Sequence, residues 1–91
     1  MKGYLYILKS PNCKRPYLGS FSNLENRIIE HNKGTTKSTK NKGPWNIDYY
    51  FEFDNLQKAK KIETIIKNKK IKITKENIKK IIESLPNKTL L

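Results

Sequence analysis

Residues 3–20 read Gly-Tyr-Leu-Tyr-Ile-Leu-Lys-Ser-Pro-Asn-Cys-Lys-Arg-Pro-Tyr-Leu-Gly-Ser and predict the centre of the fold. Successive side chains of a strand point to opposite faces, so residues 4, 6 and 8 share one face and residues 5 and 7 share the other. Both faces of residues 3–9 are apolar or aromatic, which predicts a central strand that is covered on both sides. A polar turn and residues 16–20 complete a β-hairpin, with Pro16 at the first position of its second strand.

Periodicity predicts four further elements after this hairpin. The first is a helix over residues 22–33, in which Ser22 and Glu25 have the spacing of a capping box and Gly34 suits a left-handed helix end. A strand with one buried face is expected at residues 47–53, followed by helices at 55–68 and 74–85. The predicted class is α+β, with a small three-stranded antiparallel or mixed sheet flanked by helices in the order β-β-α-β-α-α.

Length and composition favour one small domain in a reducing compartment. We expect a single domain over residues 1–85 and a short tail over residues 86–91, because 91 residues rarely form two cores. No apolar run approaches the ~18 residues of a membrane span. A single cysteine, Cys13, excludes an internal disulfide and favours the cytoplasm. The sequence contains no Cys/His cluster that would predict structural zinc.

A formal charge of +12 is the strongest bulk feature of the sequence. Residues 58–91 alone carry eleven lysines against three glutamates. Such a charge attracts polyanions, with nucleic acid the first candidate and anionic membrane the second. Because only two of the 20 basic residues are arginines, lysine is the default cation of this chain. Arg27 therefore calls for a functional reason, whereas Arg15, in the predicted turn, does not.

Arg27, His31 and Glu63 are polar residues placed beside apolar stripes. Arg27 and His31 are four residues apart, so both lie along the edge of the core-facing stripe of the first helix. Glu63 falls inside the apolar stripe of the next helix, where a carboxylate needs a partner or a cation. Together with Tyr6 and Tyr17 they suit phosphodiester hydrolysis. A carboxylate can hold a metal, a guanidinium can clamp phosphate, and a phenol or imidazole can move a proton.

The two tyrosines, His31 and Glu63 also have ordinary structural interpretations. The two tyrosines could be strand aromatics with satisfied hydroxyls, and His31 could favour the negative end of a helix. Glu63 could pair with Lys60 or Lys67 one turn away. The polar loop over residues 35–43 also has two interpretations, since it could be a mobile surface loop or a loop that contacts phosphates. The candidate nucleic-acid contacts are Lys37, Thr39, Lys40, Lys42 and Lys67.

Two tripeptides carry a resemblance to a known family. Tyr4-Leu5-Tyr6 and, after ten intervening residues, Tyr17-Leu18-Gly19 resemble the paired motifs of the GIY-YIG nuclease superfamily. The order and spacing of Arg27, His31 and Glu63 are also similar to that family. The resemblance covers roughly residues 3–83 and is closest to the small stand-alone bacterial branch. Tyr4 and Leu5 stand where the family has Gly and Ile, and Leu18 stands where it has Ile. These departures change framework positions and keep the phenols of Tyr6 and Tyr17.

This resemblance implies a metal-dependent endonuclease that hydrolyses phosphodiester bonds in DNA. The size and charge of the chain favour structure-selective or weakly sequence-specific cutting. It implies that Tyr6 and Tyr17 lie near the scissile phosphate, that Arg27 stabilises it and that His31 assists proton transfer. Glu63 would hold a single Mg²⁺ or Mn²⁺ ion. RNA stays open as a substrate, and a monomer is expected. The alternative is a non-catalytic basic nucleic-acid-binding module, or an accessory subunit of a DNA repair complex.

Overall fold

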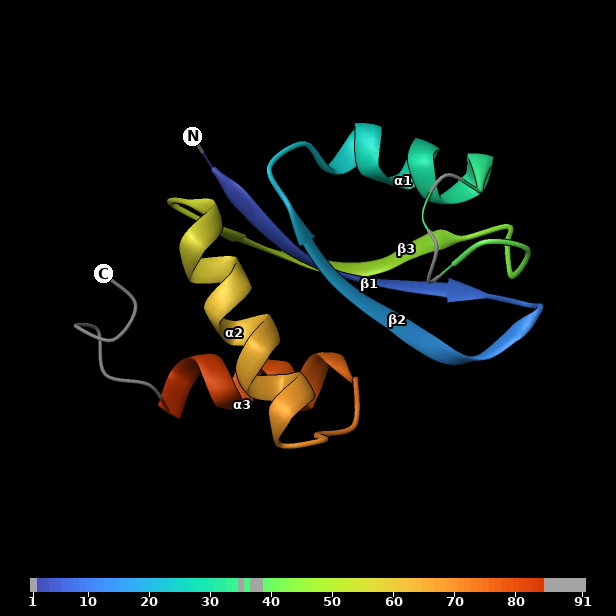
Figure 1. Ribbon diagram of the computed structural model, residues 1–91. Helices are drawn as coiled ribbons and strands as arrows, with labels where there is room; N and C mark the ends of the chain where they lie inside the picture. The colour runs from blue at the N-terminus through green and yellow to red at the C-terminus, as the bar shows by residue number, and fades with distance from the viewer. Residues whose placement is uncertain (1, 35, 37–38, 85–91) are drawn as a thin grey trace.

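The structure is a computed structural model that describes residues 2–34, 36 and 39–84. It contains a three-stranded sheet and three helices in the predicted order β-β-α-β-α-α, so the α+β class is confirmed (Figure 1). The elements are β1 (Gly3–Ser10), β2 (Cys13–Phe21), α1 (Leu24–Lys33), β3 (Asn46–Phe53), α2 (Leu56–Asn68) and α3 (Lys75–Ser84). The predicted tail over residues 86–91, and the predicted helix end at residues 85 and 86, lie outside the described residues.

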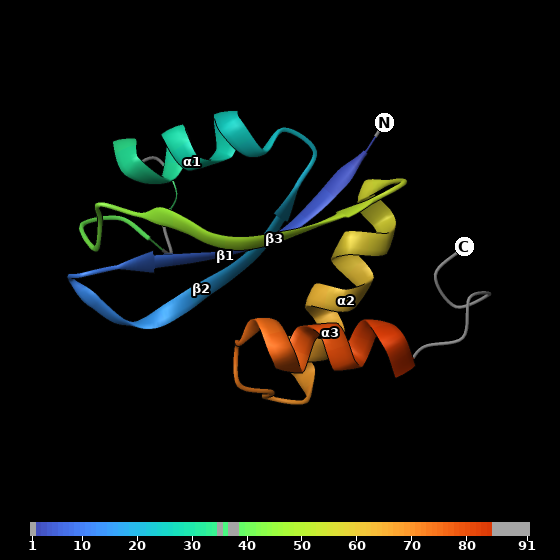
Figure 2. The ribbon, with the colours of Figure 1, turned by 180° about the vertical axis from the view of Figure 1, so that it is seen from behind.

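The hairpin strand β1 occupies the centre of the sheet, as its two apolar faces predict. The strand order is β2-β1-β3, and both neighbours run antiparallel to β1. Figure 1 shows α1 on one face of the sheet and α2 with α3 on the other, and the reverse view in Figure 2 shows the same three layers. β2 is therefore an edge strand that is flanked by helices on both faces.

The two faces of β1 pack into two different clusters. Leu5 and Ile7 are buried among aliphatic side chains of α2 and α3, together with Leu18, Ala59, Ile62, Ile66 and Ile78. Tyr6 and Leu8 are buried on the opposite face with Trp45, where Leu24 and Ile28 of α1 pack against them. The prediction that residues 4, 6 and 8 face away from residues 5 and 7 agrees with this division.

β2 is longer than the sequence predicted. It begins at Cys13 instead of at Pro16, so Pro16 lies inside the strand. The register is irregular here, since Leu8 pairs with Tyr17 but Ser10 pairs with Cys13. Proline lacks a backbone N–H and is tolerated at an irregular position of an edge strand. The predicted start of this strand at Pro16 was therefore wrong.

β3 lacks the continuous buried face that its alternation predicted. Phe51 and Phe53 pack against the aliphatic cluster, but Ile47 and Tyr49 are 38% and 40% exposed. β3 is the second edge strand, and the aliphatic cluster covers only its C-terminal half. Tyr49 instead contacts the Phe51 ring edge-on and lies beneath the Lys75 ammonium, 5.0 Å from its ring centroid.

Candidate active site

A cavity of about 300 Å³ lies over β2, and its lining comes from four elements of the fold, β1, β2, α1 and α2. The hairpin supplies Tyr6, Tyr17, Gly19 and Ser20, α1 supplies Arg27, and α2 supplies Lys60, Glu63 and Thr64. Four of the five predicted catalytic residues thus line one cavity. The fifth, His31, lies behind Tyr6 and contacts it directly.

Gly19 makes room for the Tyr6 side chain. The two residues are cross-strand partners, so their side chains would occupy the same face of the sheet. A Cβ atom built on Gly19 would lie 2.5 Å from the Tyr6 hydroxyl oxygen and 2.9 Å from the Tyr17 ring. The Tyr6 phenol therefore lies across the bare backbone of Gly19 and reaches the cavity. Here glycine is required because of close approach.

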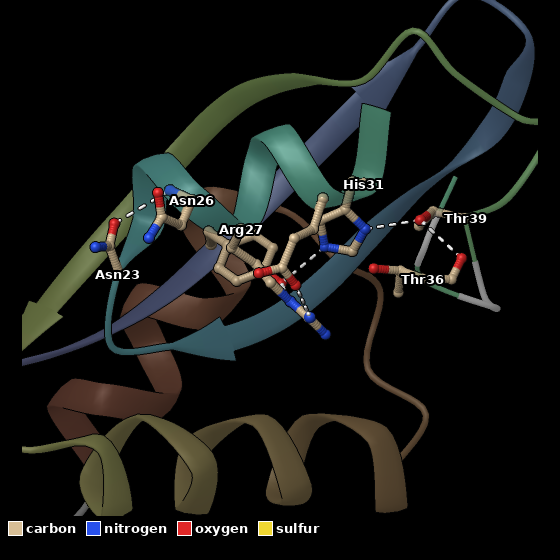
Figure 3. Close-up of polar contacts among 8 residues, drawn as sticks. Asn23, Asn26, Arg27, His31, Thr36 and Thr39 are labelled. Atoms are coloured by element: carbon tan, nitrogen blue, oxygen red, sulfur yellow. Dashed lines mark hydrogen bonds and ion pairs between the residues drawn. The ribbon is translucent and has the colours of Figure 1, made fainter. Parts of the chain in front are cut away.

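Helix α1 begins one residue later than predicted. Its N-cap is Asn23, whose side chain accepts a hydrogen bond from the Asn26 backbone N–H (Figure 3). The predicted capping box of Ser22 and Glu25 was wrong, because Asn23 adopts the extended N-cap conformation and an amide oxygen caps as well as a hydroxyl. The predicted end was right, since Gly34 has a φ of 78° and its N–H bonds to α1 carbonyls.

Arg27 extends from α1 to the Tyr6 hydroxyl. Its Nε donates to the Tyr6 oxygen at 3.3 Å, and its Nη1 pairs with Glu30 at 2.9 Å. The guanidinium carbon lies 4.9 Å from the centroid of the Phe21 ring. These contacts fix one edge of the guanidinium and leave its side chain 25% exposed at the cavity. An anion in the cavity would meet a positioned cation.

His31 is buried and bonded on both ring nitrogens. Nε2 lies 3.0 Å from the Tyr6 hydroxyl, and Nδ1 lies 2.7 Å from Thr39 Oγ1. The Thr39 hydroxyl donates to the Thr36 carbonyl, so it accepts from His31 (Figure 3). This assigns the proton to Nδ1 and leaves Nε2 to accept the Tyr6 O–H.

Burial sets the protonation states of this pair. Burial, followed by the charge of Arg27, lowers the pKa of His31 to about 4, so the imidazole is neutral at pH 7. Burial also raises the pKa of Tyr6 to about 12, against the opposing hydrogen bond from Arg27. At neutral pH the pair is therefore a phenol that donates to a neutral imidazole.

The loop before β3 supports His31. Thr39 was a predicted nucleic-acid contact, but the residue is 1% exposed and its hydroxyl binds His31. Its carbonyl accepts from the indole N–H of Trp45, which is itself buried. Lys40 and Lys42 are exposed, and Lys37 lies outside the described residues. No sequence pattern pairs Thr39 with His31, because the contact depends on how the loop folds back.

Glu63 reaches the cavity from α2 and is paired. Its carboxylate accepts from Ser20 Oγ and from Lys67 Nζ, both at 2.5 Å. The side chain is 19% exposed, which agrees with the inward position that periodicity predicts. Lys67 was one of the two predicted pairing partners. Ser20 was missed, because its contact with Glu63 joins residues 43 positions apart.

A metal ion would have one carboxylate to bind here. Among the described residues, no three His, Cys, Asp or Glu side chains gather into a metal-binding group. Mg²⁺ commonly takes one or two carboxylates, keeps several waters and uses substrate phosphates as further ligands. Glu63, open to a polar cavity, fits that mode if Lys67 releases it. The donor set therefore suits a metal that is shared with a bound phosphate.

These features define a GIY-YIG catalytic domain, and the family model of that description matches residues 2–77. The chain belongs to the GIY-YIG family, whose fold and motifs are those of a nuclease superfamily. Divalent-metal dependence and nucleic-acid binding are general properties of this family. Within the described residues, no helix is long and apolar enough to cross a membrane.

The relatives of this chain are small UPF0213 proteins. One from Clostridium perfringens is 38% identical over 84 residues, covering 89% of this chain and 83% of that protein. One from Staphylococcus saprophyticus is 38% identical over 82 residues, covering 82% and 96% respectively. The solution NMR structure of a UPF0213 protein from Bacillus halodurans is 23% identical, with a TM-score of 0.47 over 91% of this chain and 84% of that one. The name UPF0213 states no activity.

Proposed function

We propose that this protein is a metal-dependent endonuclease that hydrolyses phosphodiester bonds in DNA. The observation that carries the proposal is the meeting of Tyr6, Tyr17, Arg27 and Glu63 around one polar cavity. Tyr6, Tyr17 and Glu63 each have a stated alternative role, but packing alone would not bring a phenol, a guanidinium and a carboxylate to one opening. Family membership supplies the reaction class.

Arg27 binds and polarises the scissile phosphate in this proposal. The hydrogen bond to Tyr6 and the ion pair with Glu30 hold the guanidinium at the cavity before substrate arrives. Its remaining N–H groups can donate to a phosphate oxygen and stabilise the charge that develops there. Tyr17 lines the same cavity and positions the nucleotide beside this phosphate.

Tyr6 and His31 move the proton of the attacking water. A phenol with a pKa of about 12 is protonated at pH 7, so it needs an acceptor before it can act as a base. His31 Nε2, which faces the Tyr6 hydroxyl at 3.0 Å, is that acceptor. As water attacks phosphorus, its proton passes to the Tyr6 oxygen while the Tyr6 proton passes to Nε2. The P–O bond to the leaving group then breaks.

Glu63 would hold the divalent ion, Mg²⁺ or Mn²⁺. When bound, such an ion supplies Lewis-acid stabilisation of a phosphate oxygen and of the leaving group. Ser20 orients the carboxylate by donating to Oε1. Lys67 balances the charge of Glu63 in the free protein, and its ammonium group would be available to a neighbouring phosphate if a metal took its place at the carboxylate. The proposal includes structure-selective or weakly sequence-specific cutting.

A cleavage assay tests this function. Single-stranded, duplex, branched and plasmid DNA, with an RNA control, are incubated with Mg²⁺, with Mn²⁺ and with a chelator. Cleavage is expected only with metal, and Arg27→Ala and Glu63→Gln are each expected to lose about 10²–10³-fold in rate, the range for removing one transition-state contact. Glu83→Gln, an exposed glutamate of α3, is the matched control.

Three outcomes would contradict the proposal. Cleavage that survives in both Arg27→Ala and Glu63→Gln would show that other residues carry the reaction. Metal-independent binding without any cleavage, unharmed by Glu63→Gln, would favour the alternative of a non-catalytic basic binding module. Cutting of RNA alone would replace DNA as the substrate.

A further inference from the structure

A second and larger cavity, about 820 Å³, lies beside the candidate active site. One wall is the β2 side of the hairpin end, and the other is the end of α2 with the segment that leads to α3. Figure 1 shows that hairpin end and that segment on the same side of the molecule. Five cationic side chains line it, namely Lys14, Arg15, Lys67, Lys70 and Lys72.

The charge of this groove is not balanced within the described residues. No acidic residue is among those that line it. Of its five cations, only Lys67 forms an ion pair with a carboxylate of the described chain. Like charges held in one concave surface repel each other, and a low-dielectric wall concentrates their field. A polyanion would relieve that repulsion.

The floor of the groove is apolar, which separates it from an ordinary lysine-covered surface. Pro16, Ile66, Ile71 and Ile73 line the same cavity, and Ile71 and Ile73 are only half-buried. A cationic rim above an apolar floor matches a nucleic acid backbone, whose phosphates are anionic and whose sugar rings are not. A compact anion such as inorganic phosphate would have no use for this floor.

Lys67 connects the groove to the candidate active site. Its Nζ contacts Glu63 and lies 5.8 Å from the centroid of the Tyr17 ring. Both Glu63 and Tyr17 line the first cavity, whereas Lys67 lines the second. A strand whose phosphate occupies the first cavity can therefore continue past Lys67 into the groove.

Lys70 occupies a backbone position that favours glycine. It has a φ of 54°, and the Ile71 N–H bonds to the Ile66 carbonyl, which is the pattern of a Schellman helix end. Glycine adopts this left-handed conformation without the steric cost that a side chain brings. The chain instead places an ammonium here, on the rim of the groove.

We infer that this groove binds the DNA backbone on one side of the scissile phosphate, through Lys14, Arg15, Lys70 and Lys72. The inference deepens the proposed function and rests on it for the identity of the DNA strand. It gives Arg15 a role that its place in the predicted turn did not suggest. Lys67 is the residue shared by the groove and the active site.

Binding without cleavage provides the test. Fluorescence anisotropy with a labelled mixed-sequence DNA duplex, in chelator, is measured over a range of salt concentrations. Each phosphate contact contributes about 0.9 to the slope of log K against log salt, so K14Q/R15Q and K70G/K72Q should each lower it by roughly 1–2. Each pair should lose about tenfold in affinity. K79Q/K80Q, on exposed positions of α3 outside the groove, should lose less than about twofold.

Lys70→Gly separates loss of binding from loss of folding. This single variant should melt at a higher temperature than the natural protein, because glycine fits the left-handed position, and yet bind DNA more weakly. Weaker binding by a more stable protein cannot be caused by unfolding. Equal losses in the groove pairs and in K79Q/K80Q would overturn the groove and indicate a diffuse positive field.

Cleavage kinetics distinguish this inference from the proposed function. Groove variants should raise KM and leave kcat within about twofold, whereas Arg27→Ala and Glu63→Gln should lower kcat. If the groove pairs bind like the control pair while cleavage persists, the groove is wrong and the nuclease stands. If no cleavage occurs but the groove pairs selectively lose binding, the groove stands and the nuclease is wrong.

Discussion

On one face of β1, Leu5 and Ile7 pack among aliphatic side chains from α2 and α3, while on the other face Tyr6 bonds to Arg27 and His31. The first face needs only apolar side chains of complementary shape. The second depends on hydrogen bonds that must all be made, since a buried polar group left without a partner costs about 1–3 kcal/mol. Among the described residues, every buried side-chain polar atom has a partner.

Within this small sheet, the face covered by α2 therefore serves stability, and the face covered by α1 serves chemistry. α2 buries Ala59, Ile62 and Ile66, whereas His31 is the one fully buried residue of α1. We therefore expect changes on the α2 face to alter the free energy of unfolding, and changes on the α1 face to alter the cleavage rate more than the stability. Glu63 and the other residues that α2 contributes to the cavity lie at the edge of the helix face that packs against the sheet.

The largest expected effect is on the aliphatic face. Ile62→Ala removes three carbons from a side chain with no exposed surface, and should lower the free energy of unfolding by about 2–5 kcal/mol. Urea unfolding measures it, with cleavage per folded molecule unchanged at low temperature. Ile29→Ala, at a 49% exposed position of α1, is the matched control and should change stability by no more than about 0.5 kcal/mol.

The next effect belongs to the polar face and to rate. Gly19→Ala places a methyl group 2.5 Å from the Tyr6 hydroxyl, so the phenol must move away from Arg27 and His31. A misplacement of this kind costs about 10²-fold in rate, or about 2.7 kcal/mol of barrier. Single-turnover cleavage would measure it beside Tyr6→Phe, which removes the hydroxyl. Natural rates in Gly19→Ala would mean that the Tyr6 position is not catalytic.

A smaller effect is a pH dependence of the free energy of unfolding that arises from His31 on the polar face. The pKa of His31 is about 4 in the folded protein and about 6.5 in the unfolded chain, so between these values the unfolded chain binds the additional proton. The contribution of His31 is present above pH 6.5 and is lost as pH falls towards 4, by at most about 1.4 kcal/mol per pH unit. Urea unfolding at pH 7, 6 and 5 should show this loss.

His31→Gln is the control for this dependence, and it should have a shallower slope over the same pH range. Because the chain has one histidine, NMR can also follow its ring protons without overlap. The ring should stay neutral down to pH 5. A midpoint near 6.5 would show that His31 is hydrated and that the bonded arrangement with Tyr6 and Thr39 does not persist in solution.

The same division explains what the sequence could predict. Strand alternation and helix periodicity identified both faces of β1 and the inward position of Glu63, because those patterns report which side chains avoid water. The resemblance added the candidate catalytic residues in their order. Neither could show that Thr39 binds His31 or that Ser20 binds Glu63, since these bonds depend on tertiary placement. The exposed half of β3 was missed because alternation does not reveal where a covering helix ends.

The smallest effect concerns the ends of the helices, where the two faces should again differ. Asn23→Ala removes the amide that caps α1 and should cost about 1 kcal/mol, whereas Ser22→Ala should cost almost nothing. Because α1 has little aliphatic packing, the loss should loosen its first turn, which hydrogen exchange at the amides of residues 25–27 would report.

Asn55→Ala removes the equivalent cap from α2. There, three buried side chains should hold the helix in place, so exchange in the first turn of α2 should rise less than in α1. A larger loss in the free energy of unfolding for Ser22→Ala than for Asn23→Ala would show that Ser22, the cap predicted from the sequence, caps α1 in place of Asn23.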